Sequence, residues 1–270
     1  MTMPRLTDRT ALRRHRARAA GGDAFFLRRA MIAEVQERLR EVNRTFTAPA
    51  VVTPFPDLWA DALPGARLIA DNEVLDLTPG AQDLVIHDLC LHWADDPIGQ
   101  MVQARHALRP DGLFIGTMFG GQTLHELRAA LAHAESLVTG GLSPRVAPMG
   151  EIRDLGALLH RAGLALPVAD VTPFDVSYAS ALDLMRDLRA MGESNALDGR
   201  LRRPTRRSVI AAAAAAYAEN FGRDGRIPAT FEVVTLTGWA PDPGQQQPLR
   251  PGSAKTRLAD ALRVPEQPLK

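Results

Sequence analysis

The sequence has little cysteine and no long apolar run. Its 270 residues include one cysteine, Cys90, which excludes an intrachain disulfide and a metal site built from several cysteines. This usage is typical of a reducing compartment, and we expect the cytoplasm. There is no stretch of about 18 apolar residues, and the N-terminus lacks the apolar core of a secretory signal. We therefore expect neither a membrane-spanning segment nor export.

Lysine is also nearly absent, so that arginine supplies almost all of the positive charge. The net charge is +1 and the two signs alternate along the chain, which argues against a nucleic-acid partner. The densest basic run, five arginines within residues 200–207, either faces solvent or docks an acidic partner or a phosphate. The arginine-rich segment 5–18 resembles a transit peptide, but it has little serine and contains Asp8, so we favour a solvated helix that precedes the domain.

Strand-like and helix-like patterns alternate through the middle of the chain. Such alternation predicts a mostly parallel sheet with helices on its faces. The expected strands are 67–70, 84–87, 113–118, 164–171 and 231–237, with a weak one at Val51 and Val52. The expected helices are 25–46, 96–108, from Thr123 through Leu137, 151–161, and 179–218 around a loop near 195–204. Asp96 and Pro97 suit the N-cap and first position of a helix, and Pro110-Asp111-Gly112 predicts a turn after it.

Several segments, taken in order, resemble class I S-adenosylmethionine methyltransferases. Residues 83–86 (DLVI) resemble the fourth strand, 91–93 (LHW) the loop after it, and 108–114 the end of a helix and the fifth strand. Four further segments are more specific: 119–128 (FGGQTLHELR), 140–145 (GGLSPR), 191–195 (MGESN) and 228–231 (PATF). We call these the four shared motifs. They resemble the methyltransferase-like family that contains a mitochondrial complex I assembly factor implicated in arginine hydroxylation. The biotin-pathway malonyl-carrier-protein methyltransferase is a more distant resemblance.

The resemblance implies an α/β fold, a Rossmann-like class I methyltransferase sheet with helices on both faces. We expect a helical lead-in at 1–46 and the methyltransferase-like domain at 47–240. Helical inserts after strands 5 and 6 are expected at about 119–150 and 178–226. A flexible tail is expected at 241–270, where Leu258, Leu262 and Val264 form one short apolar pattern. This pattern suits either a disordered segment or a recognition helix.

One part of the family pattern is missing. The first strand of such folds runs into a glycine-rich turn, because only glycine lets the backbone approach the cofactor closely. Here that place is 51–57 (VVTPFPD), which contains no glycine. The segment 70–75 (ADNEVL) resembles the family's third strand but follows within twenty residues, where the family has some forty. We therefore expect a reduced N-terminal strand-helix-strand portion that lacks the acid for the ribose.

The resemblance also implies candidate site residues. S-adenosyl-L-methionine is the implied cofactor, and Asp71, Glu73 and His87 are its candidate contacts. Alternatively, Asp71 and Glu73 are ordinary solvent-exposed acids of a loop that bind no ligand.

The candidate catalytic residues are Asp88, His92 and Trp93, at the carboxyl end of the 84–87 strand, where ligands of open α/β sheets bind. A histidine there suits a general base and Trp93 a stacking platform. Alternatively, Trp93 is a core anchor and the histidines are structural. His87 and Asp88 point to opposite faces of a strand, which argues against an iron site built from them.

Two other features have competing interpretations. Gly120-Gly121 before Thr123 suits either an anion site at a helix N-terminus or a tight turn, and we favour the turn. His125 and Glu126 lack the second histidine of a zinc-protease motif, so we expect Glu126 to pair with an arginine.

Two functions remain open at this point. The first is a methyltransferase-family enzyme related to the complex I arginine hydroxylase, with an altered cofactor loop. The second is a non-catalytic assembly factor for respiratory complex I that uses the fold as a protein-binding scaffold. The expected partner is a complex I subunit or another protein.

Overall fold

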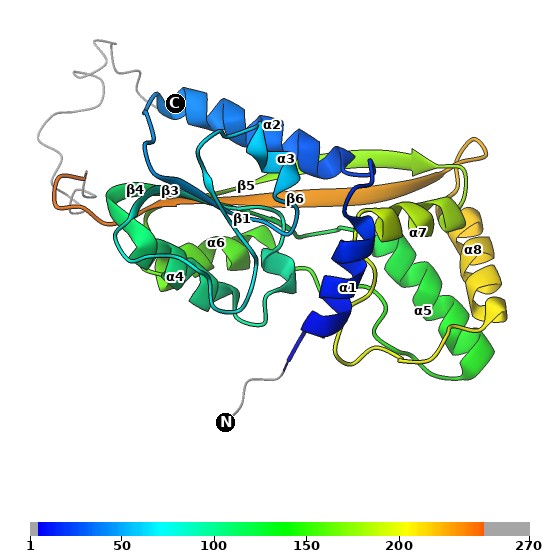
Figure 1. Ribbon diagram of the computed structural model, residues 1–270. Helices are drawn as coiled ribbons and strands as arrows, with labels where there is room; N and C mark the ends of the chain where they lie inside the picture. Colours follow the sequence, from blue (N-terminus) through cyan, green and yellow to red (C-terminus); the bar gives the residue numbers. More distant parts are fainter. Residues whose placement is uncertain (1–4, 246–270) are drawn as a thin grey trace, which may run out of the picture.

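The computed structural model describes residues 5–245, which form one twisted sheet with helices on both faces and at one end (Figure 1). In this part of the chain the sheet has six strands in the order β2-β1-β3-β4-β6-β5. The first four in that order are parallel, and β6 runs antiparallel to both of its neighbours. The strands are β1 (Pro49–Val52), β2 (Arg67–Ile69), β3 (Gln82–His87), β4 (Leu108–Phe119), β5 (Ala165–Tyr178) and β6 (Ile227–Trp239).

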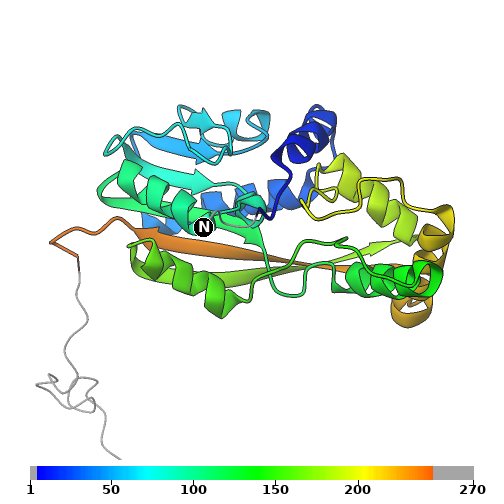
Figure 2. The ribbon, with the colours of Figure 1, turned by 90° about the horizontal axis from the view of Figure 1, so that it is seen from below.

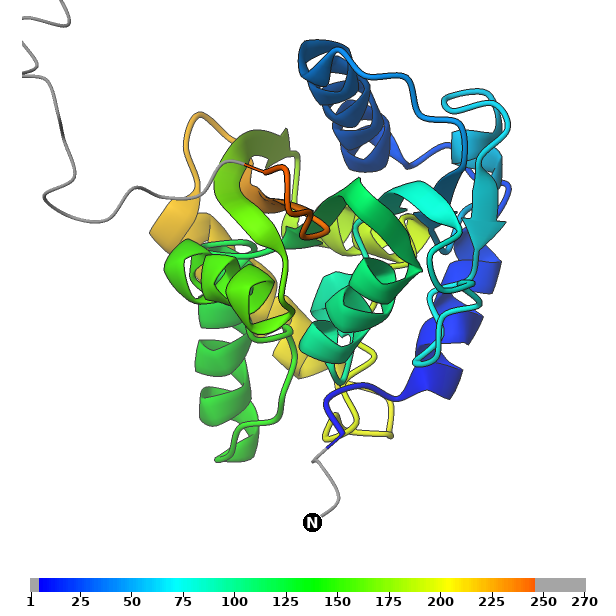
Figure 3. The same cartoon turned by 90° about the vertical axis from the view of Figure 1, so that its left-hand side faces the viewer.

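Each face of the sheet is covered by helices, because alternate residues of a buried strand point to opposite sides. Leu84 and Ile86 of β3 pack under α2 (Phe26–Val42) and α3 (Asp57–Ala60). Val85 faces the other way and belongs to the core beneath α4 (Pro97–Ala107) and α6 (Ile152–Arg161). Figure 3 shows α2 and α4 on opposite sides of the sheet. The α/β sheet with helices on both faces that the sequence predicts is confirmed.

A third core lies beyond the end of the parallel strands. There the long β5–β6 pair is covered by α5 (His125–Thr139), α7 (Ala181–Ala190) and α8 (Arg207–Phe221). Figures 1 and 2 both show these three helices gathered at the same end of the molecule. They are the helical inserts expected after strands 5 and 6, and they place the four shared motifs next to the sheet.

The N-terminal portion of the sheet is reduced, as the spacing predicts. Between β1 and β3 the chain forms only the four-residue α3 and the three-residue β2. β2 pairs directly with β1.

The first helix, α1 (Arg9–Ala19), differs from the expectation. The prediction of a solvated helix is wrong, because Leu12 and Arg16 are almost completely buried. Hydrogen bonds from Asp8 N to Ala196 O (2.8 Å) and from Asp198 N to Leu6 O (2.9 Å) tie its start to the loop after α7. The arginine-rich composition of this segment gave no sign that one face of the helix is buried.

Smaller differences concern the ends of elements. α5 begins two residues later than predicted, since Leu124 has a left-handed backbone (φ 54°). The predicted turn at Pro110-Gly112 is part of β4, which bends at Asp111 (φ 60°). The apolar pattern Leu258 to Val264 lies outside the described residues. Among the described helices, none has the length and apolar character needed to cross a membrane.

Candidate functional site

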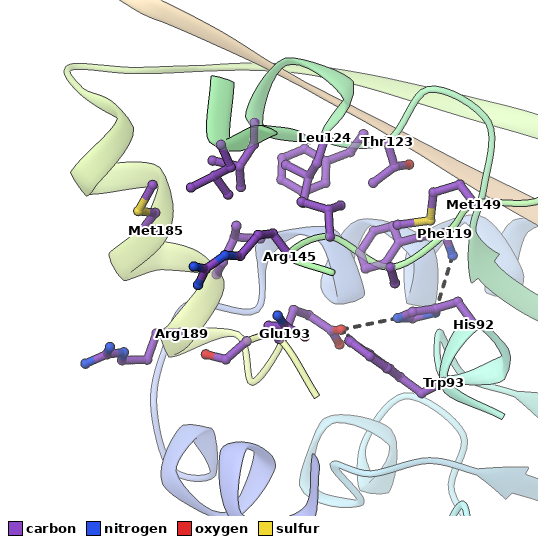
Figure 4. A pocket seen from close by; sticks show the side chains of 18 of the residues that line it. His92, Trp93, Phe119, Thr123, Leu124, Arg145, Met149, Met185, Arg189 and Glu193 are labelled. Carbon is purple, nitrogen blue, oxygen red and sulfur yellow. Dashed lines mark hydrogen bonds and ion pairs between the residues drawn. The ribbon is translucent and has the colours of Figure 1, made fainter. Parts of the chain in front are cut away.

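A cavity of about 290 Å³ lies where the helical inserts meet the end of the sheet (Figure 4). All four shared motifs contribute to its wall: Phe119, Thr123, Leu124 and Leu127 from the first, Arg145 from the second, Glu193, Ser194 and Asn195 from the third, and Phe231 from the fourth. His92 and Trp93 complete the wall from the loop after β3. Segments up to 139 positions apart in sequence, from His92 to Phe231, therefore converge on one cavity.

The wall of the cavity is mainly apolar, with polar groups at two places. The apolar part is built by leucines, methionines, an isoleucine and two phenylalanines, among them Leu131, Met149, Met185, Leu188, Ile210 and Phe231. Figure 4 shows His92, Trp93 and Glu193 on one side and Arg145 and Arg189 on the other. A large apolar surface with few polar groups is typical of a binding site.

Glu193 organises the polar side of the cavity. Its Oε2 accepts a hydrogen bond from Trp93 Nε1 (2.7 Å) and lies 3.2 Å from His92 Nε2. Its Oε1 accepts from Arg28 Nη2 (3.2 Å). Burial alone would raise the pKa of Glu193, but His92 and the two arginines Arg28 and Arg16 lower it to about 2. The carboxylate is therefore ionised at neutral pH.

His92 is held in one orientation between two partners. Besides Glu193, its Nδ1 accepts a long hydrogen bond from Phe119 N (3.5 Å), so we assign the proton to Nε2. Burial lowers the pKa of His92, and Glu193 offsets only part of this effect. The ring is therefore neutral at pH 7 and donates to Glu193.

Asp88 does not line the cavity but is connected to it through Arg28. Arg28 Nη1 donates to the carbonyl oxygen and to Oδ2 of Asp88, each at 3.0 Å, and Nη2 donates to Leu89 O. Thr53 Oγ1 donates to the same carboxylate (2.7 Å). This ion pair lies at the carboxyl ends of β1 and β3, where the strand order reverses, and we call this place the switch-point crevice.

None of the three candidate cofactor residues lines the cavity. Asp71 forms ion pairs with Arg9 and Arg16 of α1. Glu73 is exposed, and its backbone carbonyl accepts a hydrogen bond from Gln103.

His87 is completely buried, with Nε2 2.6 Å from Gln100 Oε1 and Nδ1 3.2 Å from Cys90 Sγ. Burial lowers its pKa to about 4, so the ring is neutral at pH 7. Of the six candidate site residues, only His92 and Trp93 line the cavity.

Each potential iron ligand has a different protein partner. His87 contacts Gln100, Asp88 pairs with Arg28, and His92 contacts Glu193. The three side chains do not converge on one point.

Gly120-Gly121 form a tight turn, as favoured from the sequence. The Gly120 N–H donates to Glu232 O (3.0 Å) and the Gly121 N–H to Gly150 O (2.9 Å), so both donors are already used. The prediction that Glu126 pairs with an arginine is wrong. Its carboxylate accepts hydrogen bonds from Thr230 N and Thr230 Oγ1 and contacts His125. The fourth shared motif therefore lies directly beside the first.

Glu193 and Arg28 are the residues that sequence reasoning missed. Glu193 stands inside a shared motif, which was the available signal. Arg28 lies in the predicted amphipathic helix 25–46, in a chain rich in arginine, and no local sequence feature distinguishes it from the other arginines.

Comparisons with known proteins find relatives among two kinds of curated proteins. No family model matches the chain. Relatives include "Arginine-hydroxylase NDUFAF5, mitochondrial" from Danio rerio, 40% identical over 224 residues, which cover 83% of this chain and 70% of that protein. The Homo sapiens protein of the same name is 40% identical over 83% of this chain and 65% of its own length. A malonyl-[acyl-carrier protein] O-methyltransferase from Methylovorus is 37% identical over 64% of this chain and 56% of that protein.

Among solved structures, a SAM-dependent methyltransferase from Thermotoga maritima has a TM-score of 0.43 at 12% identity. The match covers 80% of this chain and 92% of that one.

Proposed function

Because the chain belongs to the NDUFAF5 family of methyltransferase-like proteins, we propose that it is an assembly factor that binds a partner protein in the cavity of the shared motifs. The partner is a subunit of respiratory complex I, as the family resemblance implies, and the compartment is the cytoplasm. One observation carries the proposal: all four shared motifs, distant in sequence, line the same cavity. Residues that the family resemblance singles out are thus concentrated where a ligand can contact them.

The proposal does not use S-adenosylmethionine, because the residues at the switch-point crevice do not suit it. The turn after β1 is Val52-Thr53-Pro54, without the glycine that close approach of a cofactor needs. Arg28, a residue that is 3% exposed, pairs its guanidinium with Asp88 at this place. Asp71, the candidate adenine contact, is paired with Arg16. A bound nucleoside would have to displace these ion pairs.

A second candidate is hydroxylation of an arginine side chain, the activity in the name of the NDUFAF5 relatives, in which dioxygen would supply the inserted oxygen atom and an external two-electron donor would reduce the other oxygen atom to water. The observation that favours it is the ionised Glu193 carboxylate on the cavity wall, since carboxylates are the usual acceptors for a guanidinium. In this case the partner segment would present an arginine to the cavity.

We expect S-adenosylmethionine at about 1 mM to give no binding heat in calorimetry and no thermal shift. The physical reason is the Arg28–Asp88 ion pair, whose rupture would leave a buried charge unpaired. A malonyl-[acyl-carrier protein] O-methyltransferase relative serves as the positive control for the ligand. Saturable binding heat from the wild-type protein would show that S-adenosylmethionine binds, which contradicts a proposal that does not use this cofactor.

We expect Ile210→Trp, which fills the cavity from α8, to abolish assembly of complex I in cells that lack the wild-type gene. The matched control is Ala215→Trp on an exposed position of the same helix, which should restore assembly. Thermal unfolding of both purified variants checks that they fold. Normal assembly with a folded Ile210→Trp variant would overturn the proposed function. Mass spectrometry of the assembled subunits for an arginine with one added oxygen atom then separates the two candidates.

A further inference from the structure

Two loops from different parts of the chain form the mouth of the cavity. The loop 140–148 carries Arg145 and the loop 191–206 between α7 and α8 carries Thr205, and both residues line the cavity. Arg145 Nη1 donates to Thr205 Oγ1 (2.7 Å), and Asn195 Nδ2 donates to Pro144 O (2.8 Å). The two loops therefore act as one rim, which α7 continues through Arg189.

The rim carries positive charge that the described chain does not neutralise. Arg189 lines the cavity, Arg206 directly follows the wall residue Thr205 and Arg203 lies two positions before it, and all three residues are exposed. Within residues 5–245 none of them forms an ion pair or a side-chain hydrogen bond. The nearby acids already have partners, since Glu135 binds Arg145 and Asp198 binds Arg202. Unneutralised positive charge therefore lies on the cavity wall at Arg189 and, at Arg203 and Arg206, within two positions of the wall residue Thr205.

Arg145 is anchored on the cavity wall by both of its terminal nitrogens. Arg145 Nε is buried and has no hydrogen-bond partner in the described part of the chain. Its two terminal nitrogens are fixed by Thr205 and Glu135, so the side chain is held in place before any ligand arrives.

We propose that this mouth binds an acidic peptide segment of the partner, with one large apolar side chain in the cavity and flanking carboxylates on Arg189, Arg203 and Arg206. The inference rests on the proposed function and specifies the partner's chemistry. Apolar anchors that enter a pocket surrounded by charged contacts are typical of protein recognition. Arginine suits this role because its planar fork binds a carboxylate through two donors.

The test measures binding of two short fluorescein-labelled peptides by fluorescence anisotropy with the full chain. The first has a central Leu-Phe pair flanked by aspartates, and in the second lysines replace the aspartates. We expect the acidic peptide to bind and the lysine-containing peptide not to bind. The double variant Arg189→Glu/Arg206→Glu should weaken this binding by about tenfold or more, equivalent to at least about 1.4 kcal/mol. Ile210→Trp should abolish it.

The matched control is Arg109→Glu, an exposed arginine near the start of β4, whose other end reaches the cavity at Phe119. It should bind the acidic peptide as the wild type does. Absence of acidic-peptide binding, equal binding of both peptides, or no effect of the double variant would overturn the inference. A second outcome would also overturn it: the wild type binds phosphatidylglycerol vesicles, the double variant does not, and neither protein binds the acidic peptide. That result would identify a lipid surface as the ligand instead. The proposed function fails separately, if the folded Ile210→Trp variant still supports complex I assembly.

Discussion

Replacing Arg28 with alanine is expected to lower the free energy of unfolding by about 3–5 kcal/mol, the usual cost of removing one partner of a buried ion pair. The Arg28 side chain is 4% exposed, that of Asp88 1% and that of Glu193 7%. Alanine would leave Asp88 with only Thr53 and Glu193 with only His92 and Trp93. Two carboxylates would then be buried without their arginine. Urea unfolding followed by circular dichroism gives the difference.

The neighbouring Arg29 provides the control for this experiment. It lies on the same helix and is exposed, so Arg29→Ala should change the free energy of unfolding by less than about 0.5 kcal/mol. If Arg28→Ala is as stable as Arg29→Ala, the ion pairs at the switch-point crevice are not structural. In that case the argument that they oppose S-adenosylmethionine also fails.

The fold was predictable because its signals are local. Strand alternation, the Asp96-Pro97 helix start and the ordered motifs each depend on residues close in sequence. The Asp96 side chain does cap α4, accepting from Gly99 N (2.8 Å). The reduced portion after β1 was also predictable, since it follows from a simple count of residues between two recognisable segments.

The site was predictable only in part, because its charges pair over long distances. Arg28 and Glu193 are 165 positions apart, and Arg16 and Asp71 are 55 apart. Periodicity marks a helix face as polar but does not show that its arginine meets a carboxylate on another element. The same limit explains why α1 was expected in solvent.

The predicted cluster of His87, Asp88, His92 and Trp93 shows how geometry divides residues that are adjacent in sequence. His87 and Asp88 do point to opposite sides, as expected of neighbours in a strand. His87 contacts Gln100 of α4, whereas Asp88 contacts Arg28 of α2. His92 and Trp93 turn away from both into the cavity, because they lie on the short helical turn Leu91–Trp93 after the strand.

Acidification from pH 7 to pH 4 is expected to lower the free energy of unfolding by about 3 kcal/mol through His87 alone. Burial holds the pKa of His87 at about 4 in the folded protein, against 6.5 for a free histidine. Below pH 6.5 the unfolded chain takes up a proton that the folded chain does not, so stability falls as the pH decreases. The loss is nearly complete at pH 4, where the folded protein also begins to bind the proton. His92 acts in the same direction, since burial lowers its pKa too.

Urea unfolding at several pH values between 7 and 4 tests this dependence through its slope. His87→Gln removes the titrating group, and although the variant should be less stable at pH 7, its stability should fall less steeply on acidification. His133→Gln is the matched control, because His133 is exposed on α5, and it should keep the slope of the wild type. An identical slope in His87→Gln and wild type would show that the histidine beside Gln100 is not the group whose protonation opposes folding.

Since the pKa of Glu193 lies at about 2, against 4.5 for a free glutamate, the stabilisation from its buried pairs is lost separately, as the pH falls from about 4.5 to 2.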